Sequence, residues 1–202
     1  MIADKLQFIK NKILIIENFI HLDICNSIIK QIKDGELKKG KILVKDKTLV
    51  DESYRRVTSA IVDDNCVGIV SKRILEIMPS LEERFKTELN ILQKPSFLFY
   101  KKGDFFKIHT DSSEDKNSLE DVKNRKLSII IFLNTETKKI KPNSFCGGTL
   151  NFYKIDETID FSNYKFEVHG EAGTAIIFKS DILHEVSQVT NGERFTVVSW
   201  IS

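Results

Sequence analysis

Two hydrophobic patterns divide this chain, and the change falls close to residue 95. In the first part, apolar residues recur at helical spacing over residues 21–33, after which Gly35 predicts a stop. A short run rich in isoleucine, Ile13–Ile16, precedes this helix and favours a strand. Residues 40–60 give only weak strand signals. The first part therefore predicts a mixed segment of helices and short strands.

A second helical stripe covers residues 65–77 and is followed by Pro79. Because proline inside a helix removes a backbone hydrogen bond and clashes with the preceding turn, we expect the helix to end before it. Ser80 would then be the N-cap of a separate short helix over residues 81–89. The pattern thus predicts two helices in this region.

From Pro95 onward, β-forming apolar segments alternate with glycine-containing or charged loops. Many short strands of this kind indicate an antiparallel sandwich or barrel, and we expect a double-stranded β-helix (jelly roll). The fold class is therefore α+β, with the N-terminal helices packed on one sheet. We expect one domain over residues 1–202, with an α/β support at 1–94 and a jelly-roll core at 95–202. The predicted strands cover residues 97–100, 105–109, 127–133, 149–153, 165–168, 174–178 and 195–201.

Two long polar connections interrupt the β-rich part, at residues 112–126 and 135–146. Unstructured connections of this length in a compact domain are usually either functional lids or solvated insertions. The sequence leaves both alternatives open.

The composition argues against several classes of protein. The chain is 41% apolar and 30% charged, and its net charge is +2 with acids and bases intermixed, so we expect no nucleic-acid-binding face. No segment approaches the ~20 apolar residues of a membrane span, and we recognise no signal peptide. The cysteines Cys25, Cys66 and Cys146 lack the spacing of a disulfide framework or a zinc site. We therefore expect a reduced, cytoplasmic protein.

Three residues in the β-rich part are candidate metal ligands. Because residues i and i+2 of a strand point to the same face, His109 and Asp111 would present an imidazole and a carboxylate side by side. His184 follows a later predicted strand. Two histidines and one carboxylate, with further positions left open, are the ligand set of non-haem Fe(II) oxygenases. A histidine and an aspartate at this spacing also arise by chance, as ordinary surface or core residues.

The last predicted strand begins beside a candidate anion site. Arg194, Thr196, Val198 and Trp200 alternate onto one face of this strand. A guanidinium that points into a β-core needs an anion, and the carboxylate of a bound cosubstrate could pair with it in bidentate fashion. Alternatively, Arg194 pairs with an internal acid or lies at the exposed end of the strand.

Taken in order, these motifs resemble the Fe(II)/2-oxoglutarate-dependent dioxygenase superfamily and, within it, the prolyl 4-hydroxylase-like group. The resemblance covers residues 13–202 and is strongest from residue 97 to the end. Six ordered motifs are more specific than any one of them. The matching segments read ILIIENFIHLDIC, FYKKGDFFKIHTD, LSIIIFLN, GGTLNFY, AGTAIIF and HEVSQVTNGERFTVVSW.

Carried over by position, the resemblance implies an iron site and a cosubstrate anchor. The implied ligands of Fe(II) are His109, Asp111 and His184. The implied residues around the far carboxylate of 2-oxoglutarate are Arg194, Tyr100 and Thr196. Phe106 and Phe132 stand where many relatives carry tyrosine, which removes possible hydrogen bonds from the pocket.

The resemblance also implies a reaction. Fe(II), 2-oxoglutarate and O2, with ascorbate as a candidate reductant, would hydroxylate an unactivated C–H and release succinate and CO2. The carboxylate of Asp111 favours hydroxylation, because related halogenases carry a small residue there.

The substrate remains open at this level. We expect a prolyl or other residue of a peptide or protein. The alternatives are a free amino acid or other small metabolite, and a non-catalytic jelly-roll module that binds a ligand. A nucleic-acid demethylase is disfavoured, because that branch carries a second arginine where Trp200 stands. An open groove bordered by residues 112–126 and 135–146 would favour peptides, whereas a closed pocket would favour small molecules. The sequence gives neither the position attacked nor the oligomeric state.

Overall fold

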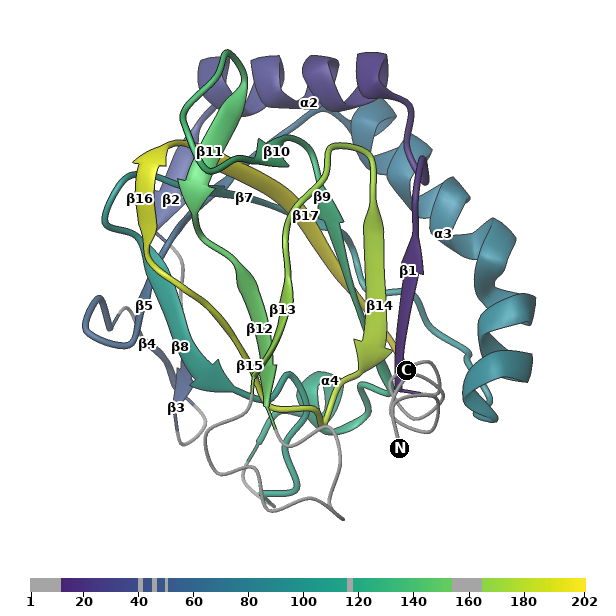
Figure 1. Cartoon of the computed structure of the whole chain (residues 1–202). Coiled ribbons are helices and arrows are strands. Elements are labelled where there is room, and N and C mark those ends of the chain that lie inside the picture. The colour runs from purple at the N-terminus through teal and green to yellow at the C-terminus, as the bar shows by residue number, and fades with distance from the viewer. Residues whose placement is uncertain (1–11, 40–41, 45–46, 50, 116–117, 154–164) are drawn as a thin grey trace, which may run out of the picture.

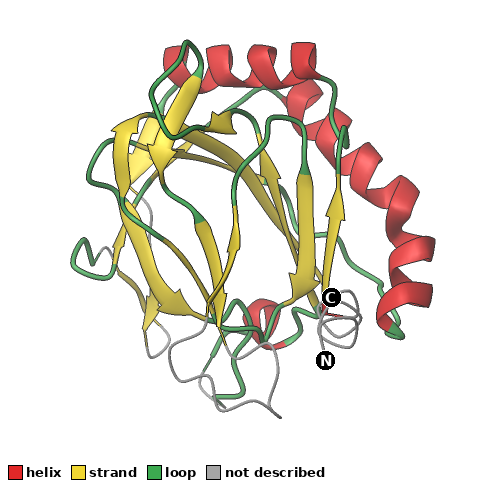
Figure 2. Ribbon diagram, viewed as in Figure 1, coloured by secondary structure: helices red, strands yellow, loops and turns green. Residues whose placement is uncertain are grey.

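The structure is a computed structural model that describes residues 12–39, 42–44, 47–49, 51–115, 118–153 and 165–202 (Figures 1 and 2). Within these residues, the larger sheet has the order β1 (Ile13–Ile16), β14 (Ala175–Lys179), β9 (Leu127–Phe132), β17 (Arg194–Ile201), β7 (Ser96–Tyr100), β6 (Thr58–Ala60) and β2 (Leu37–Lys39). The second sheet has the order β13 (Lys165–Val168), β12 (Leu150–Tyr153), β15 (His184–Val186), β8 (Phe105–His109) and β5 (Arg55–Arg56).

Smaller elements complete the fold. A third sheet joins β10 (Thr135–Glu136), β11 (Ser144–Gly147) and β16 (Val189–Gly192), and β3 (Ile42–Val44) pairs with β4 (Lys47–Leu49). The helices are α2 (Leu22–Asp34), α3 (Asp64–Phe85) and the short α4 (Glu120–Lys123). Among the described strands, every pair is antiparallel except β10 with β11. The predicted α+β jelly roll with helices on one sheet is confirmed.

The larger sheet has two differently occupied faces, because successive side chains of a strand point to opposite sides. Phe97 and Phe99 of β7 join the hydrophobic cluster under α2 and α3, whereas Leu98 and Tyr100 join the cluster between the two main sheets. Figure 1 shows both helices along the outside of the larger sheet. The helices therefore seal the outer face, and the inner face is free to build a site against the second sheet.

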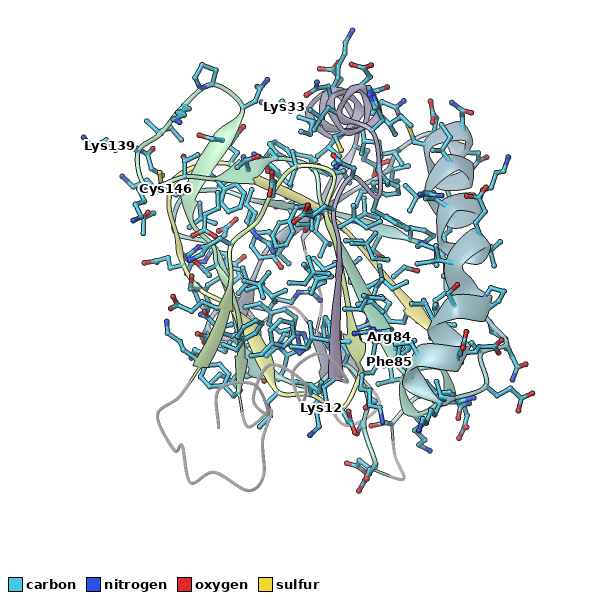
Figure 3. The ribbon with its side chains drawn as sticks, turned by 45° about the vertical axis from the view of Figure 1, so that its right-hand side comes forward. Lys12, Lys33, Arg84, Phe85, Lys139 and Cys146 are labelled. Atoms are coloured by element: carbon cyan, nitrogen blue, oxygen red, sulfur yellow. The ribbon has the colours of Figure 1, made fainter. Side chains whose placement is uncertain are left out.

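Helix α3 differs from its prediction. It is one helix that runs through Pro79, not two helices divided there, and Ser80 is not an N-cap. Ile74 before the proline and Leu81 and Phe85 after it are all buried, and Phe85 is labelled in Figure 3 where α3 meets the sheet. Burying such side chains contributes about 1.5–3 kcal/mol each, which offsets the roughly 3 kcal/mol that an interior proline costs.

The two polar connections also contain structure. Residues 112–126 include α4, and residues 135–146 include β10 and the beginning of β11. Neither connection is therefore wholly unstructured, although most of the described residues in both lie outside helices and strands. In the described part of the chain, no helix combines the length and the apolar character needed to cross a membrane.

Candidate metal centre

Neighbouring strands of the second sheet bring the three predicted ligands together. His109 at the end of β8 lies directly opposite His184 at the start of β15, and the centroids of their rings are 4.2 Å apart. Asp111 follows β8 and approaches both rings, with Oδ1 3.7 Å from Nε2 of His109 and Oδ2 3.5 Å from Nε2 of His184. One ligand atom from each residue lies within 4.8 Å of the other two.

The hydrogen bonds of the two imidazoles fix their tautomers. Nδ1 of His109 lies 2.7 Å from the carbonyl oxygen of Lys107, and Nδ1 of His184 lies 2.9 Å from that of Ile182. A carbonyl oxygen only accepts, so Nδ1 donates in both rings, and a neutral ring then keeps a lone pair on Nε2. Both lone pairs face the carboxylate of Asp111. Only a cation makes such a cluster of acceptors favourable, and this donor set fits a divalent metal ion.

Burial controls the ionisation of this cluster. It lowers the pKa of His109 to about 3, with repulsion by the nearby His184 adding to the effect and attraction to Asp111 opposing it. Burial alone would raise the pKa of Asp111, but the charges of His184 and His109 outweigh it, and Ser128 and Trp200 act in the same direction. The pKa of this carboxyl is therefore lowered. A neutral imidazole beside a carboxylate is the form that binds metal.

A cavity of about 810 Å³ lies over the three ligands, between the two main sheets. Its lining includes Arg194 and Thr196 from β17 and Tyr100 from β7. Figure 1 shows α4 at the end of the sheets where β8 ends, and residues of the 112–126 segment line the mouth. None of the lining residues comes from residues 135–146. The cavity thus joins the metal ligands to the predicted anion site.

Arg194 is buried in this cavity without a carboxylate partner. It is only 1% exposed, its Nη1 donates to Oγ1 of Thr196 at 3.2 Å, and Nε and Nη2 find no acceptor among the described residues. The guanidinium lies about equally far from the rings of Tyr100 and Phe132, at 5.0 and 5.1 Å. Burial lowers the pKa of Arg194, yet arginine stays charged in proteins. A buried, half-satisfied cation is unfavourable unless an anion completes it.

The alternatives for Arg194 can be compared with this geometry. It is not at an exposed strand end, and the nearby Glu136 is bonded elsewhere, since its carboxylate accepts from Oγ1 of Thr149 and from the backbone N–H of Gly170. Among the described residues, no carboxylate forms an ion pair with Arg194. The free edge of the guanidinium fits the distal carboxylate of a diacid.

The two phenylalanines for which the resemblance implied tyrosine in many relatives both pack beside the site. Phe106 stacks on His109, with ring centroids 3.5 Å apart and planes inclined by 17°. Phe132 is fully buried beside Arg194, and a Cβ on Gly170 would come within 2.5 Å of its ring. Both rings therefore shape the site by packing rather than by hydrogen bonds.

Sequence reasoning missed several residues of the cavity wall. Arg125 and Arg55 line it, and so does Trp200, which the sequence placed on the same face as Arg194 but without a role. Asp181 lies at the exposed rim of the cavity. Local spacing in the sequence does not indicate which residues approach a site from another element. The charge of Arg125 within a polar loop was the one signal that could have suggested its place in the cavity wall.

The other polar candidates lie away from the cavity. His21 is the N-cap of α2 and accepts from the backbone N–H of Asp23, and His169 lies 3.2 Å from the carboxylate of Glu136. Glu185 accepts hydrogen bonds from Asn151 and from Tyr153.

Comparisons with known proteins agree with this geometry. The model of the 2OG-Fe(II) oxygenase superfamily matches residues 95–202. A PKHD-type hydroxylase of Prochlorococcus marinus (strain MIT 9215) is 31% identical over 169 residues, which are 84% of this chain and 65% of that protein. The chain therefore spans slightly less than two thirds of the length of this relative.

Solved structures show the same fold at low sequence identity. A Pseudomonas putida prolyl-4-hydroxylase is 18% identical with a TM-score of 0.66, covering 100% of this chain and 98% of that one. A prolyl hydroxylase from Trichoplax adhaerens, in complex with a peptide fragment of the hypoxia inducible factor oxygen degradation domain, is 17% identical with a TM-score of 0.73, covering 100% and 87%. From the family match over more than half of its length, the chain belongs to the 2OG-Fe(II) oxygenase superfamily.

Proposed function

We propose that this protein is an Fe(II)- and 2-oxoglutarate-dependent dioxygenase that hydroxylates an unactivated C–H bond. His109, Asp111 and His184 would hold the iron, and Arg194 with Thr196 would hold the distal carboxylate of 2-oxoglutarate. The observation that carries the proposal is the buried guanidinium of Arg194, with two unpartnered nitrogens, in the same cavity as the three ligands. A non-catalytic jelly-roll module would have no reason to keep an unpaired buried cation beside a complete ligand set.

When bound, Fe(II) and 2-oxoglutarate supply the oxidising chemistry that protein side chains lack. The residues of the chain do the rest. The carbonyl groups of Lys107 and Ile182 hold the imidazoles in the tautomer that presents Nε2. Phe106 and Phe132 exclude water beside the ligands and beside Arg194. The carboxylate of Asp111 would occupy a ligand position, which favours hydroxylation over transfer of a halide.

We propose a peptide or protein substrate, with a prolyl residue as the first candidate target. Two observations support this choice: the named relative is a PKHD-type hydroxylase, and one structural neighbour is bound to a peptide. The cavity also exceeds what a five-carbon diacid fills, and its size is typical of sites for larger ligands. Hydroxylation of a free amino acid is the alternative that the experiment must separate. The cysteines are unpaired and buried, which fits a protein of the reducing cytoplasm.

The proposal is tested by product analysis. The Fe(II)-loaded protein is supplied with 2-oxoglutarate, O2 and either proline-centred peptide libraries or free amino acids. We expect succinate release together with a mass gain of one oxygen atom in a peptide. Asp111→Asn should abolish both, whereas the matched change Asp115→Asn, at an exposed residue outside the cavity lining, should leave both in place. Product only from free amino acids would contradict the peptide assignment, and no succinate from any mixture would contradict the proposed reaction.

A further inference from the structure

Two buried serines lie behind the carboxylate of Asp111. Ser128 is fully buried and is the one polar residue of β9, and Ser180, which directly follows β14, is 1% exposed. Their hydroxyl oxygens are 2.9 Å apart and form a hydrogen bond. A buried hydroxyl is unfavourable unless it is hydrogen-bonded, and an alanine at either position would avoid that cost. Packing alone therefore does not explain the pair.

The direction of these hydrogen bonds follows from the group at which they end. Ser128 also hydrogen-bonds the carboxyl group of Asp111, as does the indole N–H of Trp200. An ionised carboxylate only accepts, so the hydroxyl hydrogen of Ser128 points to Asp111. Because a serine has one such hydrogen, Ser180 must be the donor in its bond with Ser128. A chain of hydroxyl groups thus runs from Ser180 through Ser128 to the carboxylate.

Ser180 also holds the backbone of the same ligand. Its carbonyl oxygen accepts from the backbone N–H groups of Asp111 at 2.8 Å and of Ser112 at 3.0 Å. Ser180 begins the turn that leads from β14 in the larger sheet to β15 in the second sheet. Ile182, in the same turn, accepts from Nδ1 of His184. One turn therefore contacts the ligand at the end of β8 and carries the ligand at the start of β15.

We propose that Ser128 and Ser180 are positioning residues of the metal centre, whose hydroxyl chain holds the carboxylate of Asp111 in the orientation that binds iron. The inference rests on the proposed function and adds two residues to its metal site. Each hydrogen bond that the carboxylate accepts occupies a lone pair and restrains its rotation, so the group is kept from chelating the metal with both oxygens. Positions on the metal then stay open for the cosubstrate and O2.

The test measures metal binding and needs no turnover. The metal-free protein is titrated with Fe(II) without oxygen, in competition with a coloured chelator. A second titration uses Co(II), whose visible absorption spectrum reports the number and arrangement of its ligands. The variants are Ser128→Ala, Ser180→Ala and the double variant. Alanine keeps the backbone carbonyl of residue 180, so these changes remove only the hydroxyl chain.

We expect Ser128→Ala to weaken Fe(II) binding by about tenfold or more, in the range typical for residues that hold a metal ligand in place. Ser180→Ala should weaken it severalfold, because Ser128 then loses the donor that fixes its direction. In the Ser128→Ala background, Ser180→Ala should have no further effect, since Ser180 acts through Ser128. The Co(II) spectrum of Ser128→Ala should differ from that of the wild-type protein, because a carboxylate that is free to turn changes the coordination.

Ser199→Ala is the matched control. Ser199 is 1% exposed in β17, its hydroxyl donates to the carbonyl oxygen of Gln93 at 2.7 Å, and it does not line the cavity. The change removes a buried hydroxyl and its hydrogen bond, as the test variants do. It should lower the free energy of unfolding and leave both the Fe(II) affinity and the Co(II) spectrum unchanged.

The outcomes separate the two proposals. Unchanged Fe(II) affinity in Ser128→Ala or in Ser180→Ala overturns the positioning role, and so does an unchanged Co(II) spectrum in Ser128→Ala. A loss of affinity of the same size in Ser199→Ala overturns it as well, because any buried hydroxyl would then have the same effect. Additive losses in the double variant overturn the chain from Ser180 through Ser128. A wild-type protein that binds no Fe(II) instead contradicts the proposed function.

Discussion

At the scale of single residues, burial decides the chemistry of the centre. The same low-polarity surroundings keep the imidazole of His109 neutral and leave the guanidinium of Arg194 in need of an anion. The first effect prepares a metal ligand, and the second prepares an anion site. Neither effect follows from residue type alone, since His169 and Arg56 carry the same groups in exposed positions.

The lowered pKa of His109 predicts how the metal-free protein responds to acid. The unfolded chain, with a histidine pKa near 6.5, binds a proton in a pH range where native His109 does not. Stability therefore falls as pH falls, by about 1 kcal/mol between pH 6.5 and 5.5 from this residue. Asp111 causes no change in stability between pH 6.5 and 5.5. Its pKa is lowered in the folded protein, so the stability that it contributes is lost only as pH falls below about 3.8, the ordinary pKa of an aspartate. Urea unfolding at the two pH values measures the loss.

His109→Gln is the comparison for that experiment. The variant has no titrating group at the position and should lose about 1 kcal/mol less than the wild-type protein over the same interval. Equal losses in the two proteins would contradict the assignment of a neutral, buried His109.

At the scale of elements, adjacent strands convert distant sequence positions into one site. The pairing of β8 with β15 places His109 opposite His184, and the pairing of β17 with β7 places Arg194 opposite Tyr100. Both pairs follow from strand register, because alternate residues share a face. The elements thus fix the site before any side-chain contact is considered.

The long strands and the site residues on them could be predicted because their patterns are strong. β15 and β16 were missed because they are three and four residues long and carry polar residues, so their partners rather than their own sequences make them strands. Arg125 and Trp200 meet only through tertiary packing, which local spacing does not encode. The prediction that α3 would be divided at Pro79 was wrong for the same reason. The burial of residues after the proline, which local spacing does not encode, determines the length of the helix.

Helix α3 gives a prediction at this scale. Pro79 is exposed in an otherwise continuous helix, so Pro79→Ala should restore the missing hydrogen bond and raise the free energy of unfolding by about 1–3 kcal/mol. Chemical denaturation measures the change. Ser80→Ala should be nearly neutral, whereas a loss of about 1 kcal/mol would indicate that Ser80 caps a separate helix after all.

At the scale of the whole molecule, the N-terminal part packs on the core and adds Tyr54 and Arg55 to the cavity wall. The family match begins at residue 95, yet α2 and α3 cover the outer face of the larger sheet with residues such as Ile28 and Ile74. We therefore infer a single domain with a supporting part at 1–94 and a core at 95–202. Described residues of the 112–126 segment line the cavity, whereas none of residues 135–146 does.

This inference predicts the behaviour of a truncated chain. A fragment of residues 95–202 would expose the apolar face that carries Phe97, Phe99 and Val197, and would lose the β6 and β1 pairings. We expect it to aggregate or to unfold without cooperativity, as followed by circular dichroism and size-exclusion chromatography. A soluble fragment with a cooperative transition would show that the two parts are independent domains.

The most direct test of the account is an oxygen-free titration of the metal-free protein with Fe(II) and then 2-oxoglutarate. We predict a weak visible charge-transfer band at one equivalent, its loss in His184→Gln and its persistence in His169→Gln. In Arg194→Gln, the band should require about a hundredfold more 2-oxoglutarate. A wild-type protein that gives no band, or an Arg194→Gln variant with unchanged affinity for 2-oxoglutarate, would contradict the assignment of this cavity.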